Sequence, residues 1–260
     1  MQGEDIRILV LRLSAPLASF GDVAIDTTRP TDDLPGLSMI TGLLGNALGW
    51  TAADAENLQR LQDRIRLASR AERSGDGESL LRDYQTVKVS KDDRLWRTDG
   101  IVSRRTFGGK DLTITIERQR YYRAGTAVTT LISLDDGDGP GLQDLRDALR
   151  HPVHPLYIGR ASCPPSRPIC HEPGGREIIT SPNFEIALKR LPLIRSASAT
   201  GTNTLLEWPL APEAARNMSR NEASHVVERK DIRRWRENVH GGSRLVWREI
   251  YAFPETEATR

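Results

Sequence analysis

The chain has 260 residues, of which 38% are hydrophobic and 28% charged, and its formal net charge is +2. This length is enough to bury a core in one or two domains. No stretch approaches the roughly 20 apolar residues that span a bilayer, and acidic residues precede the first apolar run, which argues against a secretory signal. Because Cys163 and Cys170 are the only cysteines, a disulfide framework is not the organising principle, and we expect a reducing cytoplasm.

The near-neutral net charge conceals a partition along the chain. Residues 1–79 carry 8 basic and 12 acidic side chains, residues 80–130 carry 11 and 6, and residues 214–250 carry 9 and 5. Such charge runs are often no more than solvated faces. The alternative is a local site for a polyanion on an otherwise ordinary surface.

The first predicted elements alternate between strand and helix. Ile6–Leu13 is a short apolar run rich in β-branched residues and predicts a buried strand. Residues 37–49 have apolar side chains at helical spacing and predict a helix, and Asp54–Gln62 predicts a second, shorter one. In Ile65–Ala71 the residues Ile65, Leu67, Ser69 and Ala71 alternate with positions that include the arginines Arg66 and Arg70, a pattern typical of a half-exposed strand.

The following elements complete an α+β pattern. Residues 112–116 and 126–134 predict two neighbouring strands, and residues 142–149 predict a helix. The order of strand, helix, strand, basic insertion, strand and helix indicates an RRM-like or ferredoxin-like α+β fold. Further along the chain we predict short strands at Phe184–Leu188 and Arg244–Tyr251.

Three glycines fall within the helix predicted at 37–49. A glycine inside a helix costs about 1 kcal/mol relative to alanine. Gly49 suits a helix C-cap, but Gly42 and Gly45 cannot both be caps. We therefore predict that another group approaches the helix backbone closely at these positions.

The sequence offers no pattern for a metal site or a catalytic nucleophile. Three histidines and two cysteines lie between residues 151 and 171, but their spacing fits no common zinc pattern and prolines interrupt the run. There is no G-x-S-x-G elbow, P-loop or G-x-G-x-x-G motif. We therefore expect no catalytic residue, no metal and no cofactor. The histidines and cysteines of the run between 151 and 171 are His151, His154, Cys163, Cys170 and His171.

The basic segment at 82–123 is more informative. A turn signal in SRRTFGGK, residues 103–110, has extended sequence on both sides and predicts a long β-hairpin. Cations that meet phosphates, interleaved with aromatic rings that stack on bases, are what single-stranded RNA requires. A solvated hairpin on an unrelated protein would show the same pattern. The candidate RNA-binding residues in this segment are Arg104, Arg105, Phe107, Lys110, Arg118, Arg120 and Tyr121.

Five segments between residues 6 and 170 follow one another in a recognisable order. They are LSAPLASFGD after the first strand, TTRPT with LPGLSMITGLLGNALG, LRDYQTV, RQRYYRAGTAVTTLISL and PLYIGRASCPPSRP. Together they resemble the fifth family of CRISPR-associated proteins, part of the RAMP superfamily, in its type I-E form. The C-terminal third resembles that family only loosely.

The resemblance implies a non-catalytic subunit of a Cascade surveillance complex that caps the 5′ handle of a CRISPR RNA (crRNA). It implies an RRM-like RNA-binding domain at 1–175 with a thumb insertion at about 84–120, and a smaller C-terminal β-rich region at 176–260. The implied partners are crRNA, the CasC backbone subunits and the CasA large subunit. Target DNA near the PAM-proximal end is a further candidate partner, and no membrane partner is implied.

The resemblance also suggests further contact residues. Arg29 in TTRPT and Arg160 in IGRASCP match family arginines and would hold handle phosphates, with a salt bridge that braces a loop as the alternative for each. Gly42 and Gly45 would let RNA or a neighbouring subunit approach the helix. The chain departs from the family where LPGLS replaces PTKSG, so backbone donors at 35–38 become the expected RNA contacts there.

A rival reading belongs to the enzyme class. Type I-C relatives of the family process precursor crRNA themselves, with a metal-independent general acid–base site of the Tyr/Lys/His type. In this chain the histidines at 151–171 fall outside the glycine-containing helix and the thumb segment.

Overall fold

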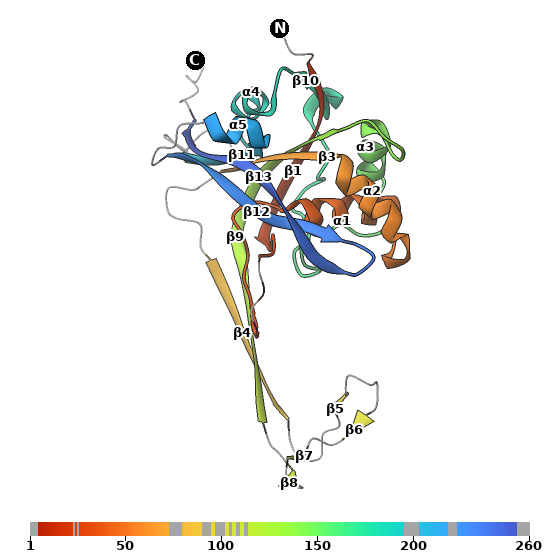
Figure 1. The fold of residues 1–260 in the computed structure, drawn as a ribbon, viewed down its shortest axis with the longest axis vertical. Helices are drawn as coiled ribbons and strands as arrows, with labels where there is room; N and C mark the ends of the chain where they lie inside the picture. The colour runs from red at the N-terminus through yellow and green to blue at the C-terminus, as the bar shows by residue number, and fades with distance from the viewer. Residues whose placement is uncertain are drawn as a thin grey trace.

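Figure 1 shows the computed structural model as a ribbon, in which a rounded body carries one long projection that points away from both chain ends. Within the described part of the chain, no helix is long and apolar enough to cross a bilayer. The structure describes residues 5–22, 24, 26–72, 80–89, 95–96, 102–103, 106–107, 110–111, 114–194, 203–217 and 223–253.

The elements up to β10 form a ferredoxin-like unit. Its four strands lie in the order β10-β1-β9-β3, and each neighbouring pair is antiparallel. Along the chain, strand, helices, strand, strand, helix and strand follow one another, which is the ferredoxin-like pattern, so the predicted α+β fold is confirmed. In chain order the elements are β1 (Ile6–Ala18), α1 (Leu37–Leu48), α2 (Ala55–Arg64), β3 (Ile65–Glu72), β9 (Ile114–Leu134), α3 (Leu142–Arg150) and β10 (Ile178–Ser181).

Strand β1 is buried on both faces, which explains its continuous apolar sequence. Leu9 and Leu11 belong to one core cluster, which α1, α2 and α3 complete. Ile8 and Val10 point to the other face and pack in a second cluster with α4 (Phe184–Arg190). Helices therefore cover both faces of the sheet, and the strand that passes between them has no polar face.

The last strands extend the same sheet. Strand β11 (Asn203–Pro209) pairs with β3, and β13 (Val239–Ala252) and β12 (Ser224–Arg234) follow outward. The strand predicted at 244–251 lies within β13. The β12–β13 hairpin crosses in front of α1 and α2 (Figure 1), and α5 (Pro212–Asn217) links β11 to it.

Residues 184–188 form a helix, α4, and the strand predicted there is wrong. Asn183 is the N-cap, because its Oδ1 accepts a hydrogen bond from the Ile186 N–H at 2.8 Å. Glu185 lies in the first turn and Lys189 in the last, where each charge complements the helix dipole. The capping signal was present in the sequence, but the short apolar run concealed it.

Strand β3 is not half-exposed as predicted, since seven of its eight residues are buried. Arg70 is fully buried and donates to the carbonyl oxygens of Leu191 at 2.8 Å and Pro192 at 2.7 Å. Arg12 of β1 also donates to Pro192 O, at 2.9 Å. Burial lowers the pKa of Arg70 to about 10, although neighbouring Glu72 opposes the shift. These arginines satisfy carbonyls at the end of α4 rather than facing water.

The predicted hairpin is present and forms the projection. Strand β4 (Leu80–Val89) pairs antiparallel with Ile114–Arg123 of β9, and we call this hairpin the thumb. The two strands predicted around the return of the hairpin are one continuous strand of 21 residues. Because β9 begins in the thumb and ends in the central sheet, the thumb is anchored in the core.

Short strands and turns complete the structure. β2 pairs with β9 in parallel, next to the base of the thumb. Two small pairs, β5–β6 and β7–β8, lie beyond the tip of the thumb (Figure 1). Their bounds, with those of the two 3-10 turns, are β2 (Thr28–Arg29), η1 (Ala52–Asp54), β5 (Leu95–Trp96), β6 (Val102–Ser103), β7 (Thr106–Phe107), β8 (Lys110–Asp111) and η2 (Pro173–Gly175).

Candidate nucleic-acid interface

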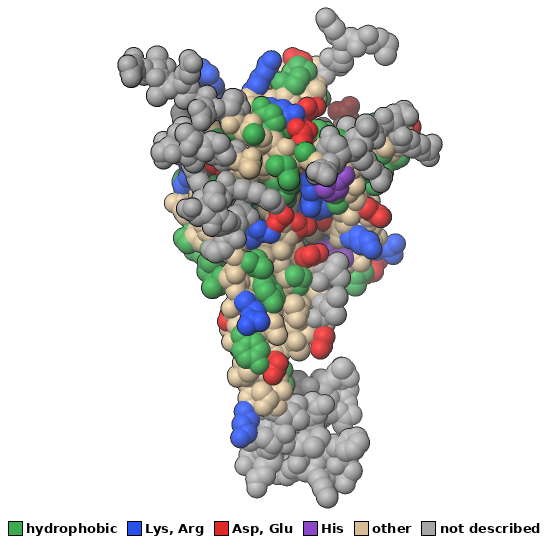
Figure 2. All heavy atoms as spheres, turned by 90° about the vertical axis from the view of Figure 1, so that its left-hand side faces the viewer, with side chains coloured by type: hydrophobic (Ala, Val, Ile, Leu, Met, Phe, Trp, Pro, Cys, Tyr) green, Lys and Arg blue, Asp and Glu red, His purple; other side chains and the backbone are tan. Residues whose placement is uncertain are grey.

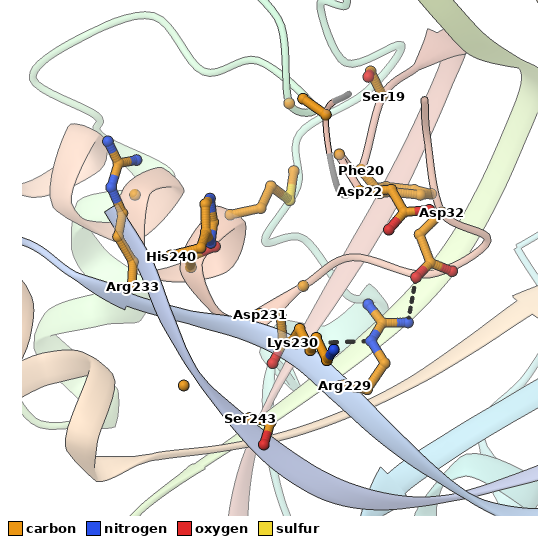
Figure 3. A pocket seen from close by; sticks show the side chains of 18 of the residues that line it. Ser19, Phe20, Asp22, Asp32, Arg229, Lys230, Asp231, Arg233, His240 and Ser243 are labelled. Carbon is orange, nitrogen blue, oxygen red and sulfur yellow. Dashed lines mark ion pairs between the residues drawn. The ribbon is translucent and has the colours of Figure 1, made fainter. Parts of the chain in front are cut away.

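A cleft of about 1300 Å³ opens between α1 and the β12–β13 hairpin (Figure 3). Its other walls are the loop after β1, with Gly21 and Asp22, and the loop after α3, with Tyr157 and Arg160. Three of the segments that resemble the CRISPR-associated family therefore meet in one place. The C-terminal hairpin is the fourth wall, which the sequence analysis did not connect with the site.

Gly159 explains how two of these walls meet. Its φ is +92°, and an added Cβ would overlap the carbonyl oxygen of Ser19. Beside it, the Ser19 N–H donates to Ile158 O at 3.1 Å. Only glycine fits here, so the IGR segment and the loop after β1 pack backbone to backbone.

Arg160 fastens the cleft to the base of the thumb. Its Nη1 donates to Tyr121 O at 3.1 Å, and its Nη2 donates to Arg29 O at 3.2 Å. The guanidinium also stacks on the ring of Tyr122 at 4.7 Å. Arg160 therefore braces the loop through backbone carbonyls and an aromatic ring. The alternative suggested by the sequence was a salt bridge.

Arg29, Arg118 and Arg120 lie along one side of the thumb. In the ladder, Arg118 lies opposite Gln85, and Arg120 is two residues further along the same face. Arg29 of β2 is the partner of Arg120 on its other side. The Arg29 side chain donates to the carbonyls of Asp26 at 2.7 Å and Thr28 at 3.0 Å.

Of the predicted aromatic and thumb-tip residues, the structure describes some but not all. Tyr121 lies on the opposite face from Arg120, and its hydroxyl donates to Gln119 Oε1 at 3.3 Å. Phe107 and Lys110 are paired through their backbones in β7–β8. The remaining predicted tip residues, Arg104 and Arg105, lie outside the described residues.

The two helix glycines have different surroundings. Gly45 is buried, and an added Cβ would lie 2.5 Å from Leu58 Cδ2 of α2. Its predicted approach partner is therefore this chain's own helix, and we correct its assignment from RNA contact to packing. Gly42 lines the cleft, with Trp235 of the hairpin 3.5 Å from an added Cβ. Gly49 is the C-cap in the left-handed conformation, as predicted.

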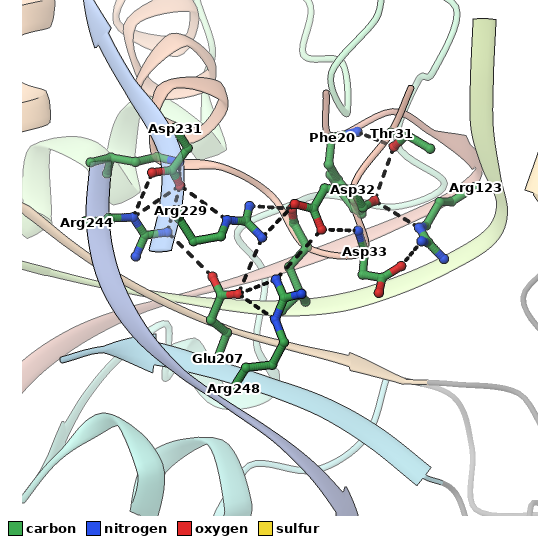
Figure 4. A network of polar contacts seen from close by, with 12 residues as sticks. Phe20, Thr31, Asp32, Asp33, Arg123, Glu207, Arg229, Asp231, Arg244 and Arg248 are labelled. Atoms are coloured by element: carbon green, nitrogen blue, oxygen red, sulfur yellow. Dashed lines mark hydrogen bonds and ion pairs between the residues drawn. The ribbon is translucent and has the colours of Figure 1, made fainter. Parts of the chain in front are cut away.

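Three arginines and three carboxylates form a neutral network along the hairpin wall (Figure 4). Arg229 is buried, with Nη1 2.9 Å from Asp32 Oδ2 and 3.4 Å from Glu207 Oε2. Burial lowers the pKa of Arg229, but the carboxylates of Glu207 and its neighbours outweigh it, so the pKa lies above its usual value. The members are Asp32, Glu207, Arg229, Asp231, Arg244 and Arg248.

Asp231 also occupies the N-terminus of α1. Its Oδ2 accepts a hydrogen bond from the Leu37 N–H at 2.9 Å and lies 2.8 Å from Arg244 Nη2. A helix N-terminus favours an anion, and here the chain supplies its own. One of the backbone donors expected to meet RNA at 35–38 is thus already engaged. The only sequence signal for this contact was the basic block at 214–250.

The histidine and cysteine cluster does not assemble a metal site. His151, His154 and His171 are exposed, whereas Cys163 and Cys170 are buried with free thiols. Burial raises the pKa of Cys170 to about 12. No group of three potential metal-ligating side chains occurs within the residues that the structure describes.

Comparisons with known proteins agree with this architecture. A family model described as CRISPR-associated protein (Cas_Cas5) matches residues 8–247. The CRISPR system Cascade subunit CasD of Escherichia coli (strain K12) is 30% identical over 166 residues, which are 62% of this chain and 68% of that protein.

Two solved structures share the fold. One, described as a crystal structure of a Cas protein, has a TM-score of 0.57 and 21% identity and covers 95% of both chains. The other, from a CRISPR RNA-guided surveillance complex, has a TM-score of 0.56 and 22% identity and covers 95% of this chain and 90% of that one. With the family match over nearly the whole described chain, these findings show that the protein belongs to the CRISPR-associated Cas5 family.

Proposed function

We propose that the chain is a non-catalytic subunit of a type I-E Cascade complex that binds and caps the 5′ handle of crRNA. The observation that carries the proposal is a continuous row of arginines from the thumb to the cleft. Arg118 and Arg120 lie within β9, and Arg29 of β2 is the strand partner of Arg120. Arg160 in turn donates a hydrogen bond to Arg29 O. We call these four residues the arginine track.

The chemistry of the track suits a single-stranded RNA backbone. Guanidinium groups donate several hydrogen bonds to phosphate oxygens and stay charged at all physiological pH values. Hydrophobic and basic side chains lie beside one another along the thumb (Figure 2). Exposed Val87 and Ile116, opposite each other on the face of Arg118, could contact unstacked bases.

The thumb also offers a surface to protein partners. On the face opposite Arg118 and Arg120, Leu80 is 52% and Tyr84 49% exposed. Exposed apolar surface of this kind marks interaction sites. We propose that the thumb and body contact the CasC backbone and CasA large subunits, with the PAM-proximal target DNA near by.

Copurification tests the proposal directly. A tagged full-length chain, expressed with its CRISPR array and partner subunits, should retain RNA whose 5′ ends come from the repeat. The RNA is then sequenced, and the purified chain is tested for binding to a synthetic copy. Absence of repeat-derived 5′ ends, or no binding to the copy, would contradict the proposed function.

A second candidate, metal-independent cleavage of precursor crRNA, is favoured by one observation. Tyr157, Lys230 and His240 all line the cleft, so groups able to move protons are present there. Incubation of the chain with precursor RNA in EDTA separates the candidates. We expect no cut, and binding within a few-fold after alanine substitution at His151, His154 and His171. A defined cut that His240→Ala abolishes would favour the nuclease.

A further inference from the structure

The wall of the cleft formed by β12 and β13 carries cations that the ion-pair network does not use. Arg229, Arg244 and Arg248 are matched by three carboxylates. Lys230 and Arg233 also line the cleft, and neither has a carboxylate within ion-pair distance in the described part of the chain. His240 lies in the same wall (Figure 3).

The hairpin is held firmly where these cations lie. Gln62 of α2 is 1% exposed; its Nε2 donates to Arg233 O at 2.8 Å, and its Oε1 accepts from the Trp235 Nε1–H at 3.1 Å. The Trp235 N–H donates to Gln59 Oε1 at 3.2 Å. The Arg233 guanidinium stacks on the Trp235 ring at 4.8 Å. These partly buried hydrogen bonds fix the backbone of the wall near Arg233, which lowers the ordering cost of binding there.

Neighbouring arginines on the same hairpin point elsewhere. Arg233 and Trp235 line the cleft, whereas Arg234 and Arg236 are not among its lining residues. Arg236 instead pairs with Glu56 of α2 at the surface. The hairpin thus divides its charges between a face toward the cleft and a face toward solvent.

We propose that Lys230 and Arg233 form a second phosphate-binding wall, which grips the RNA strand from the side opposite the loops after β1 and α3. This proposal rests on the proposed function, because it assumes that the strand guided by the arginine track enters the cleft. Ammonium and guanidinium groups are donors only, so their preferred ligands are anionic oxygens. The C-terminal third of the chain then takes part in binding RNA directly.

Two double variants of equal charge test the proposal. Lys230→Gln with Arg233→Gln removes the charges that face the cleft, and Arg234→Gln with Arg236→Gln removes two that do not. Binding of the full-length chain to synthetic RNA, copied from the RNA that copurifies with wild type, is measured across a salt series. Each lost phosphate contact flattens the slope of log K against log salt by about 0.7. We therefore expect the slope to flatten by about 1.4 for the first variant and to stay unchanged for the second.

The outcomes separate this proposal from the proposed function. If wild type binds the RNA and both variants behave alike, the wall has no phosphate role and only this proposal is overturned. If wild type binds no RNA, both fall. If the first variant melts well below wild type, the single change Lys230→Gln replaces it, because Lys230 is exposed. If the salt slope of that single variant equals the slope of wild type, the proposal is overturned.

Discussion

The thumb and the ion-pair network of the hairpin wall hold their arginines in different electrostatic settings. In the hairpin wall, Arg229 and Arg248 are largely buried and lie within 3.4 Å of carboxylates of the same chain. On the thumb, Arg118 and Arg120 have no carboxylate within ion-pair distance among the described residues, and Arg120 donates to Gln85 Oε1 at 3.3 Å. Buried, matched arginines hold the architecture together, whereas unmatched arginines at the surface remain available to a ligand.

The two regions also differ in how they are stabilised. A two-stranded hairpin is at best marginally stable alone. The thumb is stabilised because β9 continues from it into the central sheet. The network instead joins the loop between β2 and α1, which contains Asp32, to strands β11, β12 and β13 through side chains. Substitutions in the network should therefore cost stability, and substitutions on the thumb should cost binding.

The largest effect is expected at the centre of the network. Glu207 is 3% exposed and lies 2.7 Å from Arg248, 3.4 Å from Arg229 and 3.7 Å from Arg244. Glu207→Gln keeps the shape but leaves buried guanidinium charge unmatched, which costs about 3–5 kcal/mol. Urea unfolding followed by circular dichroism measures the loss.

Glu228→Gln is the matched control for this change. Glu228 is exposed and accepts a hydrogen bond from the Ser243 hydroxyl at 2.6 Å. Surface substitutions of this kind usually change stability by no more than about 0.5 kcal/mol. Equal, small losses for both variants would show that the network does not stabilise the fold.

The network also marks the limit of what the sequence could predict. The thumb followed from a turn signal between extended, basic segments, and the ferredoxin-like unit followed from the order of periodic segments. Arg229 and Glu207, by contrast, lie 22 residues apart on different strands. No local pattern indicates which arginine meets which carboxylate, because that pairing is set by the order of strands in the sheet.

Two other discrepancies have the same physical origin. Alternating arginines in β3 predicted a half-exposed strand, yet Arg70 is 0% exposed and donates to the carbonyls that follow α4. Gly45 looked like a surface for a ligand, yet Leu58 of the same chain fills the space. Residue type restricts the kind of partner, but tertiary contacts decide whether that partner lies inside or outside the chain.

A smaller loss of stability is expected at Gly45. In Gly45→Leu the side chain must enter the packed contact between α1 and Leu58, and overpacking of a core typically costs 1–3 kcal/mol, here about 2 kcal/mol. Thermal melting beside an RNA gel shift separates the causes. A variant that melts like wild type but no longer binds RNA would return Gly45 to the interface.

A small gain is expected at Gly42. An added Cβ would lie in ordinary contact with Trp235, at 3.5 Å, and alanine favours the helix by up to about 1 kcal/mol. Gly42→Ala should therefore melt slightly above wild type and bind RNA equally well. If melting is unchanged or higher but RNA binding falls sharply, the RNA must approach α1 closely at this position.

The smallest change in stability, with a clear change in binding, is expected on the thumb. Because Arg118 and Arg120 have no ion pair to lose, Arg118→Gln with Arg120→Gln should alter the free energy of unfolding by no more than about 0.5 kcal/mol. If both contact phosphates, the slope of log K against log salt flattens by about 1.4. Arg60→Gln with Arg66→Gln, which removes equal charge from exposed positions on α2 and β3, controls for net charge. Equal slopes for the two double variants would mean that RNA binding depends only on the overall charge of the protein, and the thumb and the ion-pair network would then differ only in their contributions to stability.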